Sequence, residues 1–291
     1  MRIARIGTTK DRLGEGPIWD AETQRLFWID SLAGIVHRLD PVSGERRDFT
    51  VPAPIGSLSL CRSGGAILSL QDGFYRHDFE TGVTTPFALL GLESPNVRLN
   101  DGKTDRQGRF LAGTMHLHRT EEEPVIGGLF RLDPAGAAIA LVDDIATSNG
   151  PCFSPDGGTF YYADSSRQVI WAFDYDTTTG TPGNKRVFVD LRALDTAPDG
   201  ATVDAEGHVW SALVRSGSIA RFDPSGRLVM QMDFPVRYPT SLAFGGPDLD
   251  VLYVTSISKS VRFEDPTDDA GGLFAIEGLG IRGLAEPRCA L

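Results

Sequence analysis

One sequence pattern recurs six times along the 291 residues and limits what this chain can fold into. Each copy has a polar corner followed by a short apolar strand, a further strand and a turn. The copies begin at equivalent positions, termed the start residues: Glu15, Gly56, Asn100, Asn149, Asp199 and Pro239. Successive start residues are about 40 to 50 residues apart, which is the length of one four-stranded propeller blade. The pattern therefore predicts an all-β fold, a six-bladed β-propeller.

The turns within the copies support this interpretation. Asp-Pro followed by Gly occurs in residues 40–44, 133–136 and 223–226. Such residues form tight turns because Pro fixes φ, Asp bonds back to the backbone and Gly takes a positive φ. No segment has the sustained helical periodicity of a bundle. We expect residues 1–291 to form a single domain, with residues 1–7 as the strand that completes the last blade and closes the ring.

Charge and segment composition exclude several classes of protein. A formal net charge of −11 argues against nucleic-acid binding, which needs a basic surface. No stretch approaches the roughly 18 apolar residues of a membrane span. The first residues lack the apolar core of a secretory signal, so we expect a cytoplasmic protein. The acidic run at residues 121–123 is expected to form a solvent-exposed loop.

Neither the cysteines nor the histidines have the spacing of a zinc site. The three cysteines are odd in number and widely spaced, which predicts buried free thiols: Cys61, Cys152 and Cys289. His37, His77 and His208 are scattered through strands and hairpins, and we expect them at the surface.

Four start residues carry oxygen donors in their side chains. Equivalent positions in successive blades occupy equivalent places around the ring, so Glu15, Asn149 and Asp199 are expected to converge at the mouth of the central channel, with Asn100 beside them. Carboxylate and amide oxygens suit Ca²⁺, Mg²⁺ or Mn²⁺. Asn or Asp before Gly is also a common turn residue. Glu15 has no such turn preference, however, and several donors at one repeat position favour a metal site.

Short motifs around the start residues resemble those of a known family. They are Leu13-Gly14-Glu15-Gly16-Pro17, Arg98-Leu99-Asn100-Asp101-Gly102-Lys103, Gly113-Thr114-Met115, Ser148-Asn149-Gly150-Pro151 and Pro198-Asp199-Gly200. Together they are similar to the senescence marker protein-30/gluconolactonase family, also termed regucalcin-like proteins, over almost the whole chain. The resemblance implies a six-bladed propeller that hydrolyses sugar lactones with one divalent metal ion in its central channel.

The resemblance also implies roles for individual residues. Glu15, Asn149 and Asp199 would be the metal ligands, and Asp199 would also be the catalytic base. Arg98 and Asn100 match residues that contact the substrate in the family. For the ion itself we expect Ca²⁺ first, with Zn²⁺, Mn²⁺, Mg²⁺ or Fe²⁺ as alternatives.

One position departs from the family pattern. Animal members have a Glu a few residues after Gly-Thr-Met, and this chain has His118 there. The hydroxyl pattern of the substrate is therefore expected to differ, with His118 as a candidate contact.

Three functions are compatible with these residues. The first is metal-dependent hydrolysis of an aldonolactone such as glucono-, galactono-, xylono- or arabinonolactone. The second uses the same metal site for phosphotriesters or paraoxonase-like lactones. The third is a non-enzymatic calcium-binding regulator. For the first, the expected partner is a small sugar lactone, with no nucleic acid, membrane or obligate protein partner.

Overall fold

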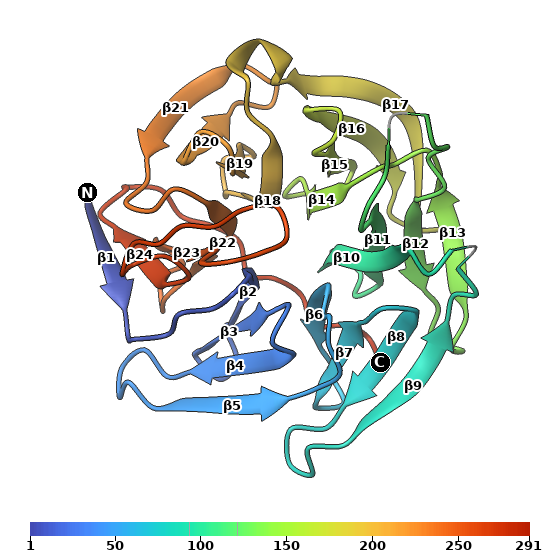
Figure 1. The fold of residues 1–291 in the computed structure, drawn as a ribbon, viewed down its shortest axis with the longest axis horizontal. Coiled ribbons are helices and arrows are strands. Elements are labelled where there is room, and N and C mark those ends of the chain that lie inside the picture. The colour runs from blue at the N-terminus through green and yellow to red at the C-terminus, as the bar shows by residue number, and fades with distance from the viewer. Residues whose placement is uncertain (93, 121) are drawn as a thin grey trace.

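The computed structural model describes residues 1–92, 94–120 and 122–291. Within these residues the chain forms six four-stranded antiparallel sheets, arranged as blades around a ring (Figure 1). The prediction of a six-bladed β-propeller is confirmed. In the acidic run, Glu122 and Glu123 are exposed as expected, and Glu121 lies outside the described residues.

Each blade is built mainly from consecutive strands, which follow one another from the channel to the rim. Blade 1 contains β2 (Gly14–Asp20), β3 (Arg25–Asp30), β4 (Ile35–Leu39) and β5 (Arg46–Thr50), and blade 2 contains β6 (Ser57–Leu60), β7 (Ala66–Ser69), β8 (Gly73–His77) and β9 (Thr84–Leu89). Blade 3 contains β10 (Val97–Thr104), β11 (Phe110–His116), β12 (Leu129–Leu132) and β13 (Ala138–Val142), and blade 4 contains β14 (Ser148–Phe153), β15 (Thr159–Asp164), β16 (Val169–Asp176) and β17 (Thr181–Asp190).

Blades 5 and 6 complete the ring. Blade 5 contains β18 (Pro198–Val203), β19 (Val209–Leu213), β20 (Ser218–Phe222) and β21 (Leu228–Asp233), and blade 6 contains β22 (Pro239–Gly245), β23 (Val251–Ser256), β24 (Leu273–Glu277) and β1 (Arg2–Ile6). A short 3₁₀ helix, η1 (Arg192–Leu194), precedes β18. No helix in the described part of the chain is long and apolar enough to cross a membrane.

The N-terminal strand closes the ring as predicted. β1 pairs antiparallel with β24, from Arg2 opposite Glu277 to Ile6 opposite Leu273. Blade 6 is thus assembled from both ends of the sequence. This pairing covers the edge of β24, which would otherwise be open to other chains.

Five inner strands share a register shift beside their start residues. The shift lies between Glu15 and Ile18 in β2, Leu99 and Gly102 in β10, Asn149 and Cys152 in β14, Pro198 and Ala201 in β18, and Pro239 and Leu242 in β22. A bulge of this kind bends a strand and changes the direction of its side chains. In β2 and β14 the bulge is permitted by Gly16 and Gly150, whose φ angles are +52° and +50°.

Apolar side chains fill the space between the blades. Trp210 of blade 5 is fully buried and meets Phe244 of blade 6 edge to face, with ring centroids 5.7 Å apart.

The outer turns have the expected chemistry. The Asp40 carboxylate accepts a hydrogen bond of 2.9 Å from the backbone N–H of Val42, and Gly44 has a φ of +74°.

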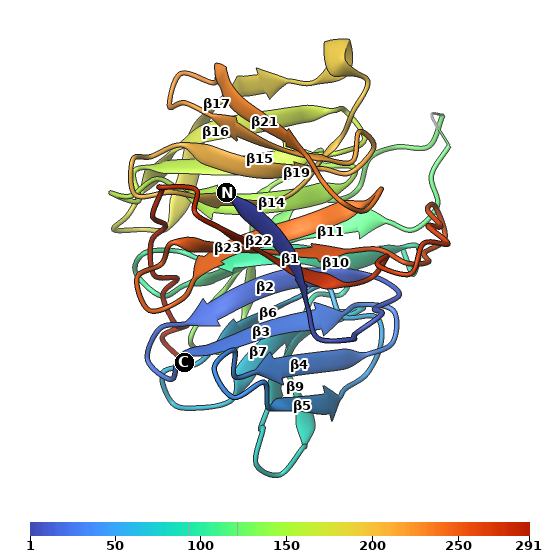
Figure 2. The ribbon, with the colours of Figure 1, turned by 90° about the vertical axis from the view of Figure 1, so that its left-hand side faces the viewer.

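The C-terminal segment, residues 283–291, closes one end of the channel. It bridges to the propeller at Gly283 and again at Cys289, which lies beside Cys61. Between these points Glu286 pairs with Lys103 at 3.1 Å. The cavity above it measures only about 30 Å³, enough for roughly one water molecule. In Figure 2 this segment lies on one face of the ring and the loop of residues 257–271 on the other.

The predictions for cysteines and histidines have different outcomes. All three cysteines are free and buried, as expected. The expected surface position of the histidines is wrong for His37 and His77, which are only 3% and 0% exposed. His37 can be buried because a set of polar partners replaces the water that would otherwise bond to its ring nitrogens.

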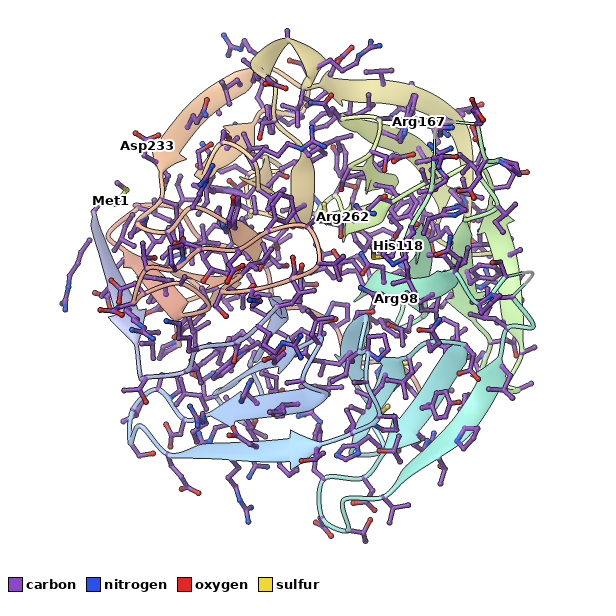
Figure 3. The ribbon with its side chains drawn as sticks, in the orientation of Figure 1. Met1, Arg98, His118, Arg167, Asp233 and Arg262 are labelled. Atoms are coloured by element: carbon purple, nitrogen blue, oxygen red, sulfur yellow. The ribbon has the colours of Figure 1, made fainter. Side chains whose placement is uncertain are left out.

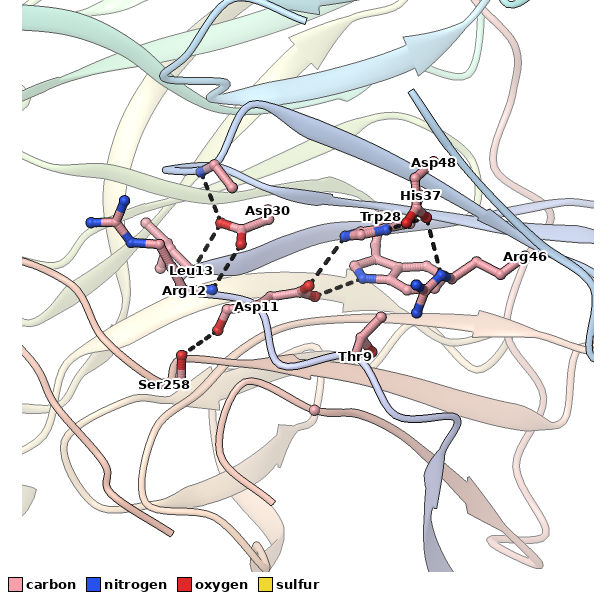
Figure 4. Close-up of polar contacts among 12 residues, drawn as sticks. Thr9, Asp11, Arg12, Leu13, Trp28, Asp30, His37, Arg46, Asp48 and Ser258 are labelled. Atoms are coloured by element: carbon pink, nitrogen blue, oxygen red, sulfur yellow. Dashed lines mark hydrogen bonds and ion pairs between the residues drawn. The ribbon is translucent and has the colours of Figure 1, made fainter. Parts of the chain in front are cut away.

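His37 lies between two carboxylates in blade 1. Its Nε2 is 3.1 Å from Oδ1 of Asp11, and its Nδ1 is 2.8 Å from Oδ1 of Asp48. The indole N–H of Trp28 donates to Asp11 at 2.8 Å (Figure 4). Asp11 precedes the first repeat, so the repeat pattern gave no sign of this contact.

Candidate active site

A cavity of about 360 Å³ opens at the end of the channel opposite the C-terminal segment. This volume is in the usual range for small-molecule sites. The cavity wall contains all five residues predicted for the site: Glu15, Arg98, Asn100, Asn149 and Asp199. They come from the inner strands β2, β10, β14 and β18, which belong to blades 1, 3, 4 and 5. The predicted residues are therefore together, and their roles stay predictions.

Two carboxylates lie in this cavity without a salt-bridging partner among the described residues. Burial, followed by the negative charges of Asp199 and Asp101, raises the pKa of Glu15 well above its ordinary value. Burial, followed by the charge of Asp101, likewise raises the pKa of Asp199. Both shifts have the same origin, because three carboxyl groups lie close together with little water.

The two amide side chains orient one another. Asn149 Nδ2 donates to Ser165 Oγ at 2.8 Å, so its Oδ1 points elsewhere. Asn100 Nδ2 donates to the Ser148 carbonyl at 2.8 Å and to Asn149 Oδ1 at 3.0 Å. Asn100 Oδ1 accepts no hydrogen bond from the described residues, although this residue lines the cavity. The Oδ1 atom of Asn100 is therefore available to a ligand.

Asp101 does not line the cavity but lies next to Glu15 and Asp199, and sequence reasoning did not single it out. Its carboxylate accepts hydrogen bonds from the backbone N–H of Gly102 at 2.8 Å and of Gly150 at 2.9 Å. Burial raises the pKa of Asp101 to about 6. Asp101 thus ties blade 3 to the bulge of blade 4 and adds negative charge behind Glu15 and Asp199. The Asn-Asp-Gly motif contained it, but its repeat position differs from that of the start residues.

The donor set fits a hard divalent cation. Two carboxylates and two amide groups from four blades face one cavity, where Asp199 is buried and Glu15 is partly buried. Buried carboxylates are costly unless a cation or hydrogen-bond donors compensate them. A bound divalent ion would supply that charge, and oxygen ligands of this kind suit Ca²⁺ or Mg²⁺.

Arg98 lies beside this acidic group and is only 4% exposed. Its Nη1 donates to the Leu99 carbonyl at 2.7 Å. Burial, and to a smaller extent the nearby charge of Arg262, lowers the pKa of Arg98 to about 10, while Glu15 acts in the opposite direction. The guanidinium therefore remains charged at neutral pH.

Loops between strands form the mouth of the cavity. Leu117 and His118 follow β11, and residues 257 and 260–263 come from the loop between β23 and β24. His118 lines the cavity, and its role as a substrate contact stays a prediction. Figure 3 shows His118, Arg98 and Arg262 near the centre of the ring. Arg215, in the turn after β19, also lines the cavity. Sequence reasoning missed Arg215 and Arg262, because neither belongs to the repeated pattern.

Comparison with known proteins identifies the family. The SMP-30/Gluconolactonase/LRE-like region matches residues 13–258. Regucalcin from Xenopus laevis is 36% identical, over 98% of this chain and 97% of the relative. The chain belongs to the SMP-30/gluconolactonase family. Its relatives in this family include 6-deoxy-6-sulfogluconolactonase from Pseudomonas putida, 35% identical over 94% of both chains. Pentonolactonase XacC from Haloferax volcanii is 33% identical, over 95% of this chain and 94% of the relative.

Solved structures of the SMP-30/gluconolactonase family have the same fold. The luciferin-regenerating enzyme superposes with a TM-score of 0.92 at 28% identity, covering 100% of this chain and 99% of the other. Regucalcin from Agrobacterium tumefaciens, described as a calcium-binding protein, has a TM-score of 0.89 at 30% identity, covering 99% and 97%.

A second acidic group lies in blade 5, outside the cavity of this family member. Asp204, Glu206 and His208 place one ligand atom each within 4.8 Å of the others. Arg221 already neutralises this group, since its Nε donates to Asp204 at 2.8 Å and its Nη2 to Glu206 at 2.5 Å. Trp210 Nε1 also donates to Asp204, at 2.9 Å. We therefore interpret the group as an internal ion-pair network.

Proposed function

We propose that this chain hydrolyses a sugar lactone, with one divalent metal ion held by Glu15, Asn149 and Asp199. The observation that supports this most strongly is the convergence of their oxygen donors, from three blades, in one cavity, where burial raises the pKa values of Glu15 and Asp199. Relatives of similar length are named as lactonases. The chain is accordingly a hydrolase that acts on carboxylic ester bonds.

The residues around the cavity have distinct tasks in this reaction. A divalent ion bound there supplies Lewis-acid stabilisation for the negative charge that develops on the lactone carbonyl oxygen. Asp199 takes a proton from the water molecule that attacks the carbonyl carbon. It returns that proton to the ring oxygen as the C–O bond breaks and a hydroxyl forms. The product is the open aldonic acid.

Arg98 and Asn100 position the sugar. The guanidinium of Arg98 is fixed by its bond to the Leu99 carbonyl, and the amide of Asn100 is fixed by its two bonds to blade 4. Fixed donors and acceptors hold the lactone ring in one orientation, which lowers the entropic part of the barrier. We propose Ca²⁺ as the ion, because the donors are all oxygens.

Proton release from a panel of lactones tests this function. Glucono-, galactono-, xylono- and arabinonolactone are incubated with the protein as purified, after chelation, and after addition of Ca²⁺, Mn²⁺, Mg²⁺ or Zn²⁺. We expect turnover above spontaneous hydrolysis that chelation abolishes and one ion restores. Turnover that survives complete removal of metal would contradict the metal-dependent mechanism. The absence of turnover with every lactone and ion would contradict the function itself.

A further inference from the structure

The mouth of the cavity carries positive charge that hydrolysis of a neutral lactone does not need. Three guanidinium groups line the cavity: Arg98 from β10, Arg215 from the turn after β19, and Arg262 from the loop between β23 and β24. His118 lies among them. The whole chain has a net charge of −11, so this concentration of arginines runs against its overall charge.

These arginines have no carboxylate partner of their own. Among the described residues, none of the three forms an ion pair within 4.0 Å. Arg215 and Arg262 are exposed, and among the described residues the guanidinium of Arg262 donates only to the backbone carbonyl of His116, at 3.3 Å. Arg262 lies near enough to Arg98 for its charge to contribute to lowering the pKa of Arg98. Guanidinium groups that repel one another around a cavity favour an anion between them.

The carboxylates of the cavity do not neutralise the positive charge of these arginines. Glu15 and Asp199 are its acidic lining residues, and both are proposed metal ligands. A divalent ion would neutralise their two charges, and the one further carboxylate behind them, Asp101, carries a single charge against three guanidinium groups. A cavity of this kind attracts and holds an anionic molecule more strongly than a neutral one.

We infer that the lactone carries an anionic substituent, a phosphate, sulfonate or carboxylate, and that Arg262 and Arg215 bind it at the mouth of the cavity. This inference rests on the proposed function, because it places the lactone ring at the base beside Glu15, Asn149 and Asp199. Arg262 and Arg215 are then specificity-determining residues. They come from blades 5 and 6, across the ring from Arg98 in blade 3.

Steady-state kinetics on matched substrates test the inference. The kcat/KM of the metal-loaded protein is compared for gluconolactone and for its 6-phosphate, its 6-deoxy-6-sulfonate and the corresponding lactone with a carboxylate at C6. We expect at least one anionic lactone to be preferred about tenfold or more, through a lower KM. The anionic lactone with the highest kcat/KM identifies the anionic group that the site binds. Equal kcat/KM for neutral and anionic lactones would overturn the inference and leave the proposed function intact.

Variants separate a charge effect from a structural one. Arg262→Gln and Arg215→Gln are each expected to reduce the preference for the anionic lactone about tenfold by raising its KM, and Arg262→Lys should restore part of it. Arg12→Gln is the matched control, since Arg12 is exposed near the cavity but does not line it. If Arg262→Gln lowers kcat/KM equally for neutral and anionic lactones, Arg262 only holds its loop on His116, and the inference fails.

A binding measurement gives an answer that does not depend on turnover. Titration calorimetry compares gluconate with 6-phosphogluconate, first at low and then at high ionic strength. We expect tighter binding of the phosphorylated acid, with a difference that shrinks as salt screens the charges. Equal affinities would overturn the inference. Stronger binding of the phosphorylated acid by a protein that opens no lactone would retain the anion site and refute the proposed function.

Discussion

Glu15 and Asp199 line the cavity and Asp101 lies close behind them, and the different hydrogen bonds of these three carboxyl groups give them different tasks. Asp101 is held by the backbone N–H groups of Gly102 and Gly150, so its oxygens are already engaged. Glu15 and Asp199 each have fewer such contacts and line the open cavity. This difference makes Glu15 and Asp199 the better ligands and Asp101 a source of fixed negative charge behind them.

Asp199→Asn should abolish most of the turnover. An amide can still offer an oxygen to a cation but cannot accept the proton of the attacking water, so we expect kcat to fall about 10³-fold. Initial rates at saturating metal measure the effect. Asp195→Asn is the matched control, because Asp195 is exposed and lies in the same connection to blade 5. A kcat within a factor of two of wild type would refute the assignment of Asp199 as the base.

Asp101→Asn should weaken metal binding without removing a ligand. The substitution deletes one negative charge near Glu15 and Asp199, and we expect the Kd for Ca²⁺ to rise about tenfold. Calorimetric titration with Ca²⁺ measures the Kd of wild type and variant. Asp268→Asn, at an exposed position, is the control. An unchanged Kd would show that Asp101 acts only through its backbone hydrogen bonds.

At the scale of the strand, the bulge that five of the six inner strands share positions the residues of the site. Gly150 has a φ of +50°, and a Cβ there would lie 2.6 Å from the Asp199 carbonyl oxygen and 2.9 Å from the Ala201 Cβ. The bulge of blade 4 therefore packs directly on the strand that carries Asp199. Two of the proposed ligands, Asn149 and Asp199, are positioned by this one contact.

Gly150→Ala should disturb both stability and activity. We expect a loss of about 2–4 kcal/mol in unfolding free energy, because backbone strain adds to the steric overlap with blade 5. Gly44→Ala is the matched control: φ is +74° but no atom lies within 4 Å of the added Cβ, so only strain of about 1–2 kcal/mol applies. Denaturant unfolding and kcat are measured for both. Equal losses in the two variants would contradict the packing argument.

The His37 cluster in blade 1 should make stability depend on pH. Burial lowers the pKa of His37, but hydrogen bonds and charges from Asp11 and Asp48 outweigh it, so the pKa is raised above its ordinary value of 6.5. Burial also raises the pKa of Asp11. A raised histidine pKa gives stability that is fully present below the unfolded pKa and is lost as the pH rises through the folded pKa.

His37→Gln should therefore destabilise the protein more at pH 6 than at pH 9. Glutamine can keep a hydrogen bond but cannot take the positive charge, and we expect a loss of about 1–3 kcal/mol at pH 6. Chemical denaturation of wild type and variant at both pH values gives the two differences. A difference that grows with pH would contradict the proposed protonated His37.

At the scale of the whole molecule, the ring explains how much of the site could be predicted. A propeller places equivalent residues of its blades around one axis, so residues far apart in the sequence share one repeat position. This is why Glu15, Asn100, Asn149 and Asp199 could be found from spacing alone. Arg98 was found only through the resemblance to the family.

Apart from Asp101, the features that escaped prediction lie outside the repeat. Arg215 and Arg262 belong to connections that differ between blades, and their meeting at the cavity depends on how the loops cross the mouth. The C-terminal segment crosses several blades, and its Glu286 meets Lys103 of blade 3. His37 was misplaced because Asp11, which precedes the repeat, buries it. Such contacts depend on tertiary structure and leave no periodic signal.

We propose that one metal ion, bound by Glu15, Asn149 and Asp199, makes this propeller a lactonase. The most direct test is to titrate metal-free protein with Ca²⁺ while following binding by calorimetry and lactone hydrolysis by proton release in parallel samples. We predict that hydrolysis rises with binding and reaches its maximum at about one ion per chain, and that Asp199→Asn binds the ion more weakly and stays inactive. Full activity before any ion binds would contradict this proposal. So would a protein that binds one ion but hydrolyses no lactone with any of the metals in the panel above.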